Sequence, residues 1–238
     1  MKFAVTVVRP PGYMHSAAFD EVAETIHCGL RSLGHDSVLT SEGLLPGRRH
    51  IVLGSNLLPH YSLPLAPDAI LYNLEQVEPG AAWFGPDLIG VLRRHAVWDY
   101  NERNAGKLEA LGVPVAHVVP IGYAGELARI ERAPQPDIDV LFFGSVNSRR
   151  RAVLEQMHAA GMRVEAVFGL YGRERDQLIG RAKLVLNLHY YDAKVLEMVR
   201  ISYLLANRCA VLSERSMDPQ EDDALAGGVA FADYDRLA

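Results

Sequence analysis

Cysteine, long apolar runs and positive charge are scarce in this 238-residue chain. Its two cysteines, Cys28 and Cys209, are too few for a disulfide framework and form no metal-binding pattern, as is typical of a protein from the reducing cytoplasm. Every apolar run is shorter than the roughly 20 residues that span a membrane, so no transmembrane segment is expected. A net charge of −5 argues against a nucleic-acid partner bound through its phosphates. We therefore expect a cytoplasmic protein with small partners.

Strand-like and helix-like segments alternate along almost the whole chain, which predicts an α/β fold. From Ala124 to Asp137 charged residues give way to two prolines, a composition that suits a linker. The alternation restarts at Ile138, so we predict two Rossmann-like domains, residues 1–130 and 137–238. Neither contains the Gly-x-Gly-x-x-Gly fingerprint or a Walker phosphate loop, which argues against a dehydrogenase or an ATPase.

The segment from Lys183 to Ser213 carries the most information about a site. A near-continuous apolar run, Lys183–Leu188, is typical of a parallel strand covered on both faces. We predict a helix after it, with Asp192 as the N-cap and Asn207 as a left-handed C-cap. Ligands of open α/β sheets bind outside the carboxyl ends of the strands, so His189 and the start of this helix are expected beside a ligand.

Three charged residues, Lys194, Glu197 and Arg200, recur every three positions on this otherwise apolar predicted helix. Glu197 can accept hydrogen bonds from ribose or sugar hydroxyls, while the two cations can face a phosphate. The alternative is that the three side chains only neutralise one another.

Two strand-to-helix turns are further candidates for ligand binding. At the first, Gly144 and Ser145 precede Arg149 and Arg150, and free amides with clustered guanidinium groups suit a diphosphate. The alternative is a plain turn with Ser148 as N-cap and arginines on a solvated face. At the second turn, Gly172 lets the backbone approach a ligand and Tyr171 can lie over a flat ring, although glycines also end strands for purely geometric reasons.

In the first half, His15 follows the first strand and precedes the first helix. A neutral imidazole there can act as a general base to a hydroxyl, and the alternative is an ordinary loop residue. Polar groups also follow two later strands, at 73–76 and 99–104, where they match the wall of a cleft. Within the second group, we interpret Asn101 as the N-cap of the next helix.

The order of several short motifs resembles that of GT-B-type glycosyltransferases. Leu30–His35 followed by Ser37–Thr40 is similar to the LxxxGHxVxxLT start of these enzymes. Leu111–Pro114 and Val118–Tyr123 resemble the close of their first domain, and Val140–Ser145 resembles the start of their donor-binding domain. The family's Glu-x7-Glu pair is replaced here by a histidine and a glutamate at the same spacing, His189 and Glu197.

This resemblance implies two Rossmann-like domains facing each other across a cleft, and a metal-independent transfer of sugar from a nucleotide diphosphate-sugar to an acceptor hydroxyl. His15 would be the catalytic base, and no cofactor beyond the donor substrate is implied. Relatives usually continue beyond the Gly227–Phe231 region, so the chain is either a compact member or lacks part of the second domain. Two alternatives stay open: a nucleotide-sugar epimerase or hydrolase on this fold, and a non-catalytic binding protein.

Overall fold

The computed structural model describes residues 1–78 and 83–238, which form two compact units, 1–124 and 125–238. The division falls earlier than in the predicted domains, 1–130 and 137–238, because the segment predicted to be a linker packs on the second unit. The backbone amides of Arg129 and Ile130 both donate to Asn207 Oδ1 at 2.8 Å. The Arg132 guanidinium donates to two backbone carbonyls of the second unit. Linker-like composition does not reveal such contacts.

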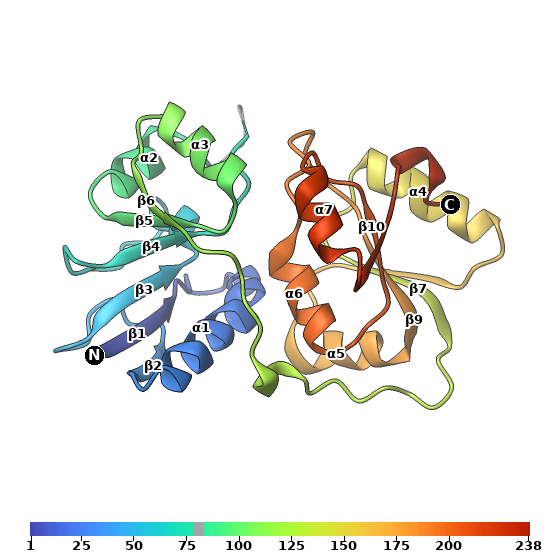
Figure 1. The fold of residues 1–238 in the computed structure, drawn as a ribbon, viewed down its shortest axis with the longest axis horizontal. Coiled ribbons are helices and arrows are strands. Elements are labelled where there is room, and N and C mark those ends of the chain that lie inside the picture. The colour runs from blue at the N-terminus through green and yellow to red at the C-terminus, as the bar shows by residue number, and fades with distance from the viewer. Residues whose placement is uncertain (79–82) are drawn as a thin grey trace. The chain divides into compact units, whose positions relative to one another are not determined.

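The first unit is a parallel sheet of six strands within the described residues, in the order β2-β1-β3-β4-β5-β6 (Figure 1). The strands are β1 (Lys2–Val7), β2 (Asp36–Thr40), β3 (Arg49–Leu53), β4 (Ile70–Asn73), β5 (Ala96–Asp99) and β6 (Val115–Val118). The helices are α1 (Asp20–Ser32), α2 (Pro86–Leu92) and α3 (Glu102–Ala110), and the 3-10 turns are η1 (Met14–Phe19), η2 (Ser55–Leu57) and, at the start of the second unit, η3 (Gly125–Leu127).

The core of the first unit explains its strand composition. All four residues of β4 are buried, as expected for an inner parallel strand covered on both faces. Leu71 and Val97 pack in one cluster with Leu88 of α2 and Leu108 of α3. α1 packs along β1 and β2. The polar residues that follow β3, β4 and β5 therefore lie at the carboxyl edge of a well-packed sheet.

The second unit is a parallel sheet of five strands in the part of the chain that the structure describes, ordered β11-β10-β9-β7-β8 (Figure 1). Its strands are β7 (Ile138–Phe143), β8 (Val164–Val167), β9 (Ala182–Asn187), β10 (Val211–Glu214) and β11 (Val229–Ala232). Its helices are α4 (Ser148–Ala159), α5 (Gly172–Arg181), α6 (Met198–Ala206) and α7 (Pro219–Leu225), with a last 3-10 turn, η4 (Tyr234–Arg236).

Two hydrophobic clusters cover the two faces of this second sheet. On one face Phe142 and Leu186 pack against α4 and against Leu237 near the C-terminus. On the other face Leu141 and Val185 pack with the apolar side chains of α5 and α6. Both expectations of an α/β fold and of a doubly covered strand near 183–188 are thus confirmed, and the two sheets are consistent with two Rossmann-like domains.

The predicted helix from Asp192 to Asn207 is wrong in its first half. α6 starts only at Met198, and Lys194 has a positive φ of 45°. The loop is drawn into the fold because Val195 and Leu196 are buried, and because Met217 donates its amide to the Lys194 carbonyl at 3.1 Å. Tertiary contacts of this kind override local helix propensity.

The helix ends also differ from some of the predicted caps. The predicted left-handed C-cap is wrong, since Asn207 has φ −97° and the left-handed residue is Arg208, with φ 53°. At α4 the N-cap is Asn147, whose side chain accepts from the Arg150 amide, and not Ser148. The prediction that Asn101 caps α3 is confirmed, because its side chain accepts from the amides of residues 103 and 104.

Candidate functional site

Each sheet has a topological switch point, where successive strands are added first on one side of a strand and then on its other side. Ligands of open α/β sheets bind at such a point. In the second sheet β7 lies between β8 and β9, so this switch point is at the carboxyl ends of β7 and β9. Gly144 follows β7 directly, and His189 comes two residues after the end of β9. A cluster of charged and polar side chains, here called the polar cluster, surrounds these ends; its members are Arg149, Arg150, Asn187, His189, Lys194, Glu197, Arg200, Ser213 and Glu214.

Asn187, the last residue of β9, is fully buried and joins three side chains of the polar cluster. Its Nδ2 donates to Glu197 Oε2 at 2.9 Å and to Ser213 Oγ at 3.0 Å. Its Oδ1 accepts from Arg200 Nη1 at 2.7 Å. The Asn187 side-chain amide therefore holds the Glu197 carboxylate and the Arg200 guanidinium at the same time. Its own position is fixed because it stands at the end of a buried strand.

Arg200 extends from α6 to the end of β7. A Cβ placed on Gly144 would lie 2.8 Å from Arg200 Nη2, so the guanidinium occupies the space that any other residue's side chain would fill. Arg200 also lies 5.1 Å from the ring centroid of Phe143, a cation–π distance. The Arg200 Nε atom is buried and has no hydrogen-bond partner among the described residues.

Glu197 and His189 form a buried electrostatic pair. His189 Nδ1 lies 3.0 Å from Glu197 Oε2, outside hydrogen-bond geometry, and the ring is inaccessible to solvent. Burial by itself lowers the pKa of His189, but the negative charges of Glu197 and Glu214 and the close contact with Glu197 together outweigh it, and the net pKa is raised. Burial likewise raises the pKa of Glu197, but His189, Arg200 and Asn187 together bring the pKa below its ordinary value. The two shifts agree that the charged pair is favoured.

Arg150 lies between the start of α4 and the end of β9. Its guanidinium donates to the carbonyl oxygens of Ser145, at 2.8 Å, and of Leu188. Its Nη2 is 3.7 Å from Glu197 Oε1, which has no hydrogen-bond partner. Burial lowers the pKa of Arg150 to about 10, so the side chain keeps its charge at neutral pH.

Glu214, at the end of β10, balances two of the cations. Its carboxylate accepts hydrogen bonds from both terminal nitrogens of Arg149, and Lys194 Nζ lies 3.1 Å from its Oε1. Burial raises the pKa of Glu214, but the hydrogen bonds from Arg149 and Lys194 reverse this shift and leave the pKa lowered. Arg149 also stacks on the Tyr234 ring, with 3.9 Å between guanidinium carbon and ring centroid. Arg149 is thereby committed to internal contacts.

The balance of charges in the polar cluster is positive. Four side chains are cationic (Arg149, Arg150, Lys194 and Arg200) and two are acidic (Glu197 and Glu214), which leaves two positive charges before His189 is counted. Several buried polar atoms have no hydrogen-bond partner, namely Arg150 Nε, His189 Nε2, Glu197 Oε1 and Arg200 Nε. Buried polar groups are normally paired, so these atoms, unpartnered among the described residues, make this end of the sheet the candidate for a polar ligand.

The structure brings together most of the residues that the sequence singled out in the second half. Gly144, Arg149, Arg150, His189, Lys194, Glu197 and Arg200 converge at the end of the second sheet. Ser145 is exposed, with its carbonyl bound by Arg150, and the Gly144 amide is bound to the Val167 carbonyl. Tyr171 and Gly172 lie at the start of α5, after β8. The charges do not merely neutralise one another as helix neighbours, since Lys194 pairs with Glu214.

Sequence reasoning missed Asn187, Ser213 and Glu214. The available signal was a polar residue at the end of two apolar strands, LVLN and VLSE.

His15 belongs to the first unit, where it lies in η1 beside the Tyr13 ring, with 5.3 Å between centroids.

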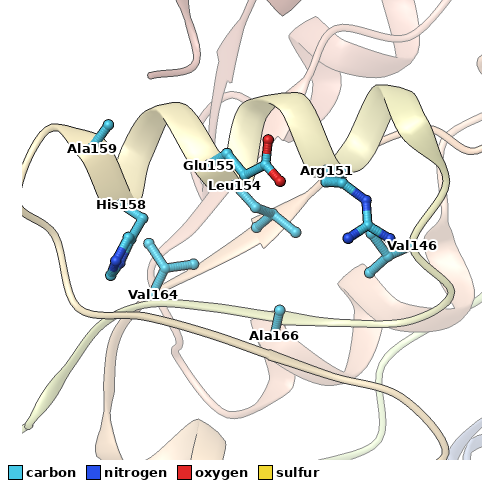
Figure 2. A pocket seen from close by; sticks show the side chains of 8 residues that line it. All are labelled: Val146, Arg151, Leu154, Glu155, His158, Ala159, Val164 and Ala166. Atoms are coloured by element: carbon cyan, nitrogen blue, oxygen red, sulfur yellow. The ribbon is translucent and has the colours of Figure 1, made fainter.

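A pocket opens on another flank of the second unit, between α4 and the edge strand β8 (Figure 2). Its volume is 470 Å³. The lining is mostly apolar and consists of Val146, Arg151, Leu154, Glu155, His158, Ala159, Val164 and Ala166. Arg151 thus faces this pocket, whereas its neighbours Arg149 and Arg150 contact the polar cluster.

Comparison with known proteins gives a fold and distant relatives. No family model matches the chain. Uncharacterized protein L138 of Acanthamoeba polyphaga mimivirus is 35% identical over 104 residues, which cover 42% of this chain and 12% of that protein. Uncharacterized protein L140 of the same virus is 28% identical over 176 residues, 71% of this chain and 56% of that protein. The chain therefore matches only part of the length of these relatives.

Among solved structures, AviGT4, a glycosyltransferase involved in avilamycin A biosynthesis, matches with a TM-score of 0.52 and 15% identity. The match covers 100% of this chain and 85% of AviGT4. The chain therefore has a glycosyltransferase-like Rossmann-type α/β fold. Among the described residues, no helix is both long enough and apolar enough to cross a membrane.

Proposed function

We propose that the protein is a GT-B-type glycosyltransferase that moves a sugar from a nucleotide diphosphate-sugar to an acceptor hydroxyl. The observation that carries the proposal is the net positive, buried polar cluster at the switch point of the second sheet. A diphosphate supplies the negative charge and the acceptor oxygens that this cluster lacks. The likeness of the fold to AviGT4 supports the same class of reaction.

Within this proposal, the second unit binds the donor. Arg150 and Arg200 stabilise the leaving diphosphate, because each has a buried Nε without a partner. Glu197 accepts a hydroxyl of the ribose or of the sugar through Oε1, while its other oxygen is held by Asn187. His189 keeps Glu197 ionised and can donate through Nε2 when protonated.

The cations also take over the charge neutralisation that a divalent ion provides in other transferases, so we propose a metal-independent reaction.

Two side chains of the same type allow a matched test of donor binding. Arg200 is partly buried in the polar cluster, whereas Arg163 is largely exposed near the amino end of β8 and pairs with Asp139. Arg200→Gln and Arg163→Gln remove the same charge from the two ends of the sheet.

The test is calorimetry with UDP, GDP, dTDP and ADP, followed by the corresponding nucleotide sugars. We expect at least one nucleoside diphosphate to bind, with affinity reduced about 100-fold or more in Arg200→Gln and nearly unchanged in Arg163→Gln. Glu197→Gln, which keeps the side-chain shape, should weaken binding of the nucleotide sugar. Equal affinities in both arginine variants would remove the polar cluster from the donor site.

Product analysis separates transfer from the other reactions possible on this fold. Nucleoside diphosphate released together with a glycosylated acceptor supports the proposal. Free sugar as the sole product, or an epimerised sugar formed without acceptor, would identify a hydrolase or an epimerase. Tight donor binding without turnover of any acceptor in a broad panel would identify a binding protein.

A further inference from the structure

A second set of polar side chains lies at the carboxyl edge of the first sheet. The switch point of this sheet is at β1 and β3, since β1 lies between β2 and β3. Ser16 belongs to η1, which follows β1, and Asn56 belongs to η2, which follows β3. Glu75 comes two residues after the end of β4, the strand beside β3. These residues therefore occupy the position where an open α/β sheet binds its ligand.

The loop that carries Glu75 is fixed by two asparagines. Asn73 Nδ2 and Asn104 Nδ2 both donate to the Glu75 carbonyl, at 2.9 Å and 2.8 Å. Asn104 Oδ1 accepts from the Val77 amide at 2.6 Å. Both asparagines are buried. These hydrogen bonds fix the backbone of Glu75 and involve its carbonyl, not its carboxylate.

Asp99, the other acid at this edge, has a structural role. Its Oδ2 accepts from Asn73 and Asn104 at 2.7 Å and 2.9 Å, and its Oδ1 accepts from the Asn101 amide at 2.9 Å. It is fully inaccessible to solvent. Its hydrogen bonds are thus used to hold the two asparagines that fix the Glu75 loop.

The carboxylate of Glu75 differs from that of Asp99 in having little internal support. From the described residues it accepts one long hydrogen bond, 3.3 Å from Asn56 Nδ2, and the residue keeps some exposure to solvent. Burial raises the pKa of Glu75 to about 7, and it raises the pKa of Asp99 to about 7 as well, so the scarcity of hydrogen bonds to the carboxylate from the described residues is what sets Glu75 apart. Glu75 is thus poised to gain or lose a proton near neutral pH, the property required of a general base.

Asn56 provides an independent sign of a missing ligand. The residue is 4% exposed, and its Oδ1 is buried without a hydrogen-bond partner in residues 1–78 and 83–238, while its Nδ2 is bound to Glu75. Turning the amide over would place Oδ1 at Glu75 and leave Nδ2 unpartnered instead, so either orientation leaves one polar atom unsatisfied. Ser16 Oγ, on the neighbouring turn, is also buried without a partner. Buried polar atoms are usually satisfied, so the pattern indicates a polar ligand here.

We propose that Glu75 and Asn56 bind a hydroxyl of the sugar acceptor and that Glu75 accepts its proton. This inference rests on the proposed glycosyltransferase function. In the transfer step, the acceptor O–H bond breaks and its proton moves to a Glu75 oxygen. The acceptor oxygen forms a bond to the anomeric carbon of the donor, while the bond from that carbon to the diphosphate oxygen breaks. The diphosphate leaves with the electron pair, and the protonated Glu75 later returns its proton to water.

Few other charges affect Glu75. Tyr13, in the segment after β1, interacts with it electrostatically, and burial together with Glu75 raises the pKa of that tyrosine. Asp99 stands at the end of β5 and is held by the same asparagines. Glu78 follows in the same loop and pairs with Lys107 of α3 at 3.2 Å. Glu78 therefore offers a matched control, a glutamate three positions away that already has a cationic partner.

The first experiment measures nucleoside diphosphate release from UDP-, GDP- and dTDP-sugars with water as the acceptor, between pH 5 and 9. We expect the rate of the wild-type protein to rise with pH through about 7, as Glu75 ionises. Glu75→Gln should lower the rate by roughly 10²-fold and abolish the rise, with donor affinity by calorimetry unchanged. Glu78→Gln should retain both the rate and the rise. His15→Ala is included because His15 is the base expected from the sequence.

A wild-type rate and pH profile in Glu75→Gln would overturn the proposal, as would loss of the pH-dependent rise in His15→Ala alone. A second experiment is independent of turnover: carbon-13 NMR titration of the Glu75 carboxyl in the intact chain. An ordinary pKa near 4 would overturn the assignment of Glu75 whatever the activity. Failure of every nucleotide to bind would instead refute the proposed function, and the titration would still report on Glu75.

Discussion

The Arg200 guanidinium lies against Gly144, with its Nη2 2.8 Å from the position of a Cβ on that glycine. Gly144 has φ 142°, a conformation that residues with a side chain rarely adopt. Two independent reasons therefore favour glycine at this position: the backbone conformation and the space taken by the Arg200 guanidinium. The contact joins the end of β7 to α6 and so fixes where the positive charge of the polar cluster stands.

Gly144→Ala tests this contact against Gly161→Ala. Gly161 also has a positive φ, 88°, but a Cβ there would meet nothing within 4 Å. Both variants should lose about 1 kcal/mol of stability from backbone strain, measured by urea unfolding. Only Gly144→Ala should also displace Arg200 and weaken nucleoside diphosphate binding, by about 10-fold or more in calorimetry. Equal binding in the two variants would show that Arg200 can move without consequence.

Asn187→Ala should destabilise the second unit strongly. The change leaves the partly buried Arg200 and Glu197 without their shared partner, which typically costs about 3 kcal/mol. Asn147→Ala is the control, because it removes the N-cap of α4 and one exposed hydrogen bond to the Tyr190 carbonyl, and it should cost about 1 kcal/mol. Both values come from urea unfolding at pH 7. A loss in Asn187→Ala no larger than in the control would mean that the amide is not central to the cluster.

The His189–Glu197 pair predicts a pH dependence of stability. Because the pKa of His189 is raised in the folded state, its contribution is complete below the unfolded value of about 6.5 and is lost as pH rises through the folded pKa. Glu197, with a lowered pKa, contributes above its unfolded value and loses that contribution as pH falls through its folded pKa. His189→Gln should therefore flatten the decline in unfolding free energy above about pH 6.5. An unchanged slope would show that His189 stays neutral.

Removal of metal ions should leave the proposed reaction intact. The cations of the polar cluster balance the charge of the diphosphate, so EDTA treatment should change the rate of nucleoside diphosphate release by less than about two-fold. Added magnesium or manganese should not raise the rate either. A loss of activity with EDTA that magnesium restores would contradict the proposed role of Arg150 and Arg200.

Glu75→Gln should be more stable than the wild-type protein in alkaline solution. Since burial raises the pKa of Glu75 to about 7, its stabilising contribution is present below the unfolded value of about 4.3 and is lost as pH rises through about 7. The variant cannot ionise, so its melting temperature at pH 8 should exceed that of the wild-type protein, while at pH 5 the two should be close. A variant less stable than wild type at both pH values would show a purely structural role for Glu75.

Local signals gave a good account of the elements but not of their tertiary contacts. Asn101 was predicted to cap α3 from its position before the helix, and a cap needs only neighbouring amides, so the prediction is confirmed. The prediction that the helix begins after Asp192 is wrong, because Val195 and Leu196 are buried in a loop. In the sequence, their spacing from the later apolar residues matches one face of a helix. His189 and Glu197, which were predicted from the sequence as separate ligand-site residues, lie 3.0 Å apart, and this contact was not predicted.

The sequence by itself determined the alternation of strands and helices, and hence the parallel sheets and the strand ends at which a ligand is expected, because apolar patterning and turn residues act over short distances. Only the tertiary structure decided which polar side chains meet there. Asn187 and Glu214 joined the polar cluster because β9 and β10 are neighbours, and strand order is not encoded in any one segment. In the first sheet, the same kind of packing left the Glu75 carboxylate with one long hydrogen bond from the described part of the chain, while Asp99, an acid of similar chemistry, accepts three shorter ones.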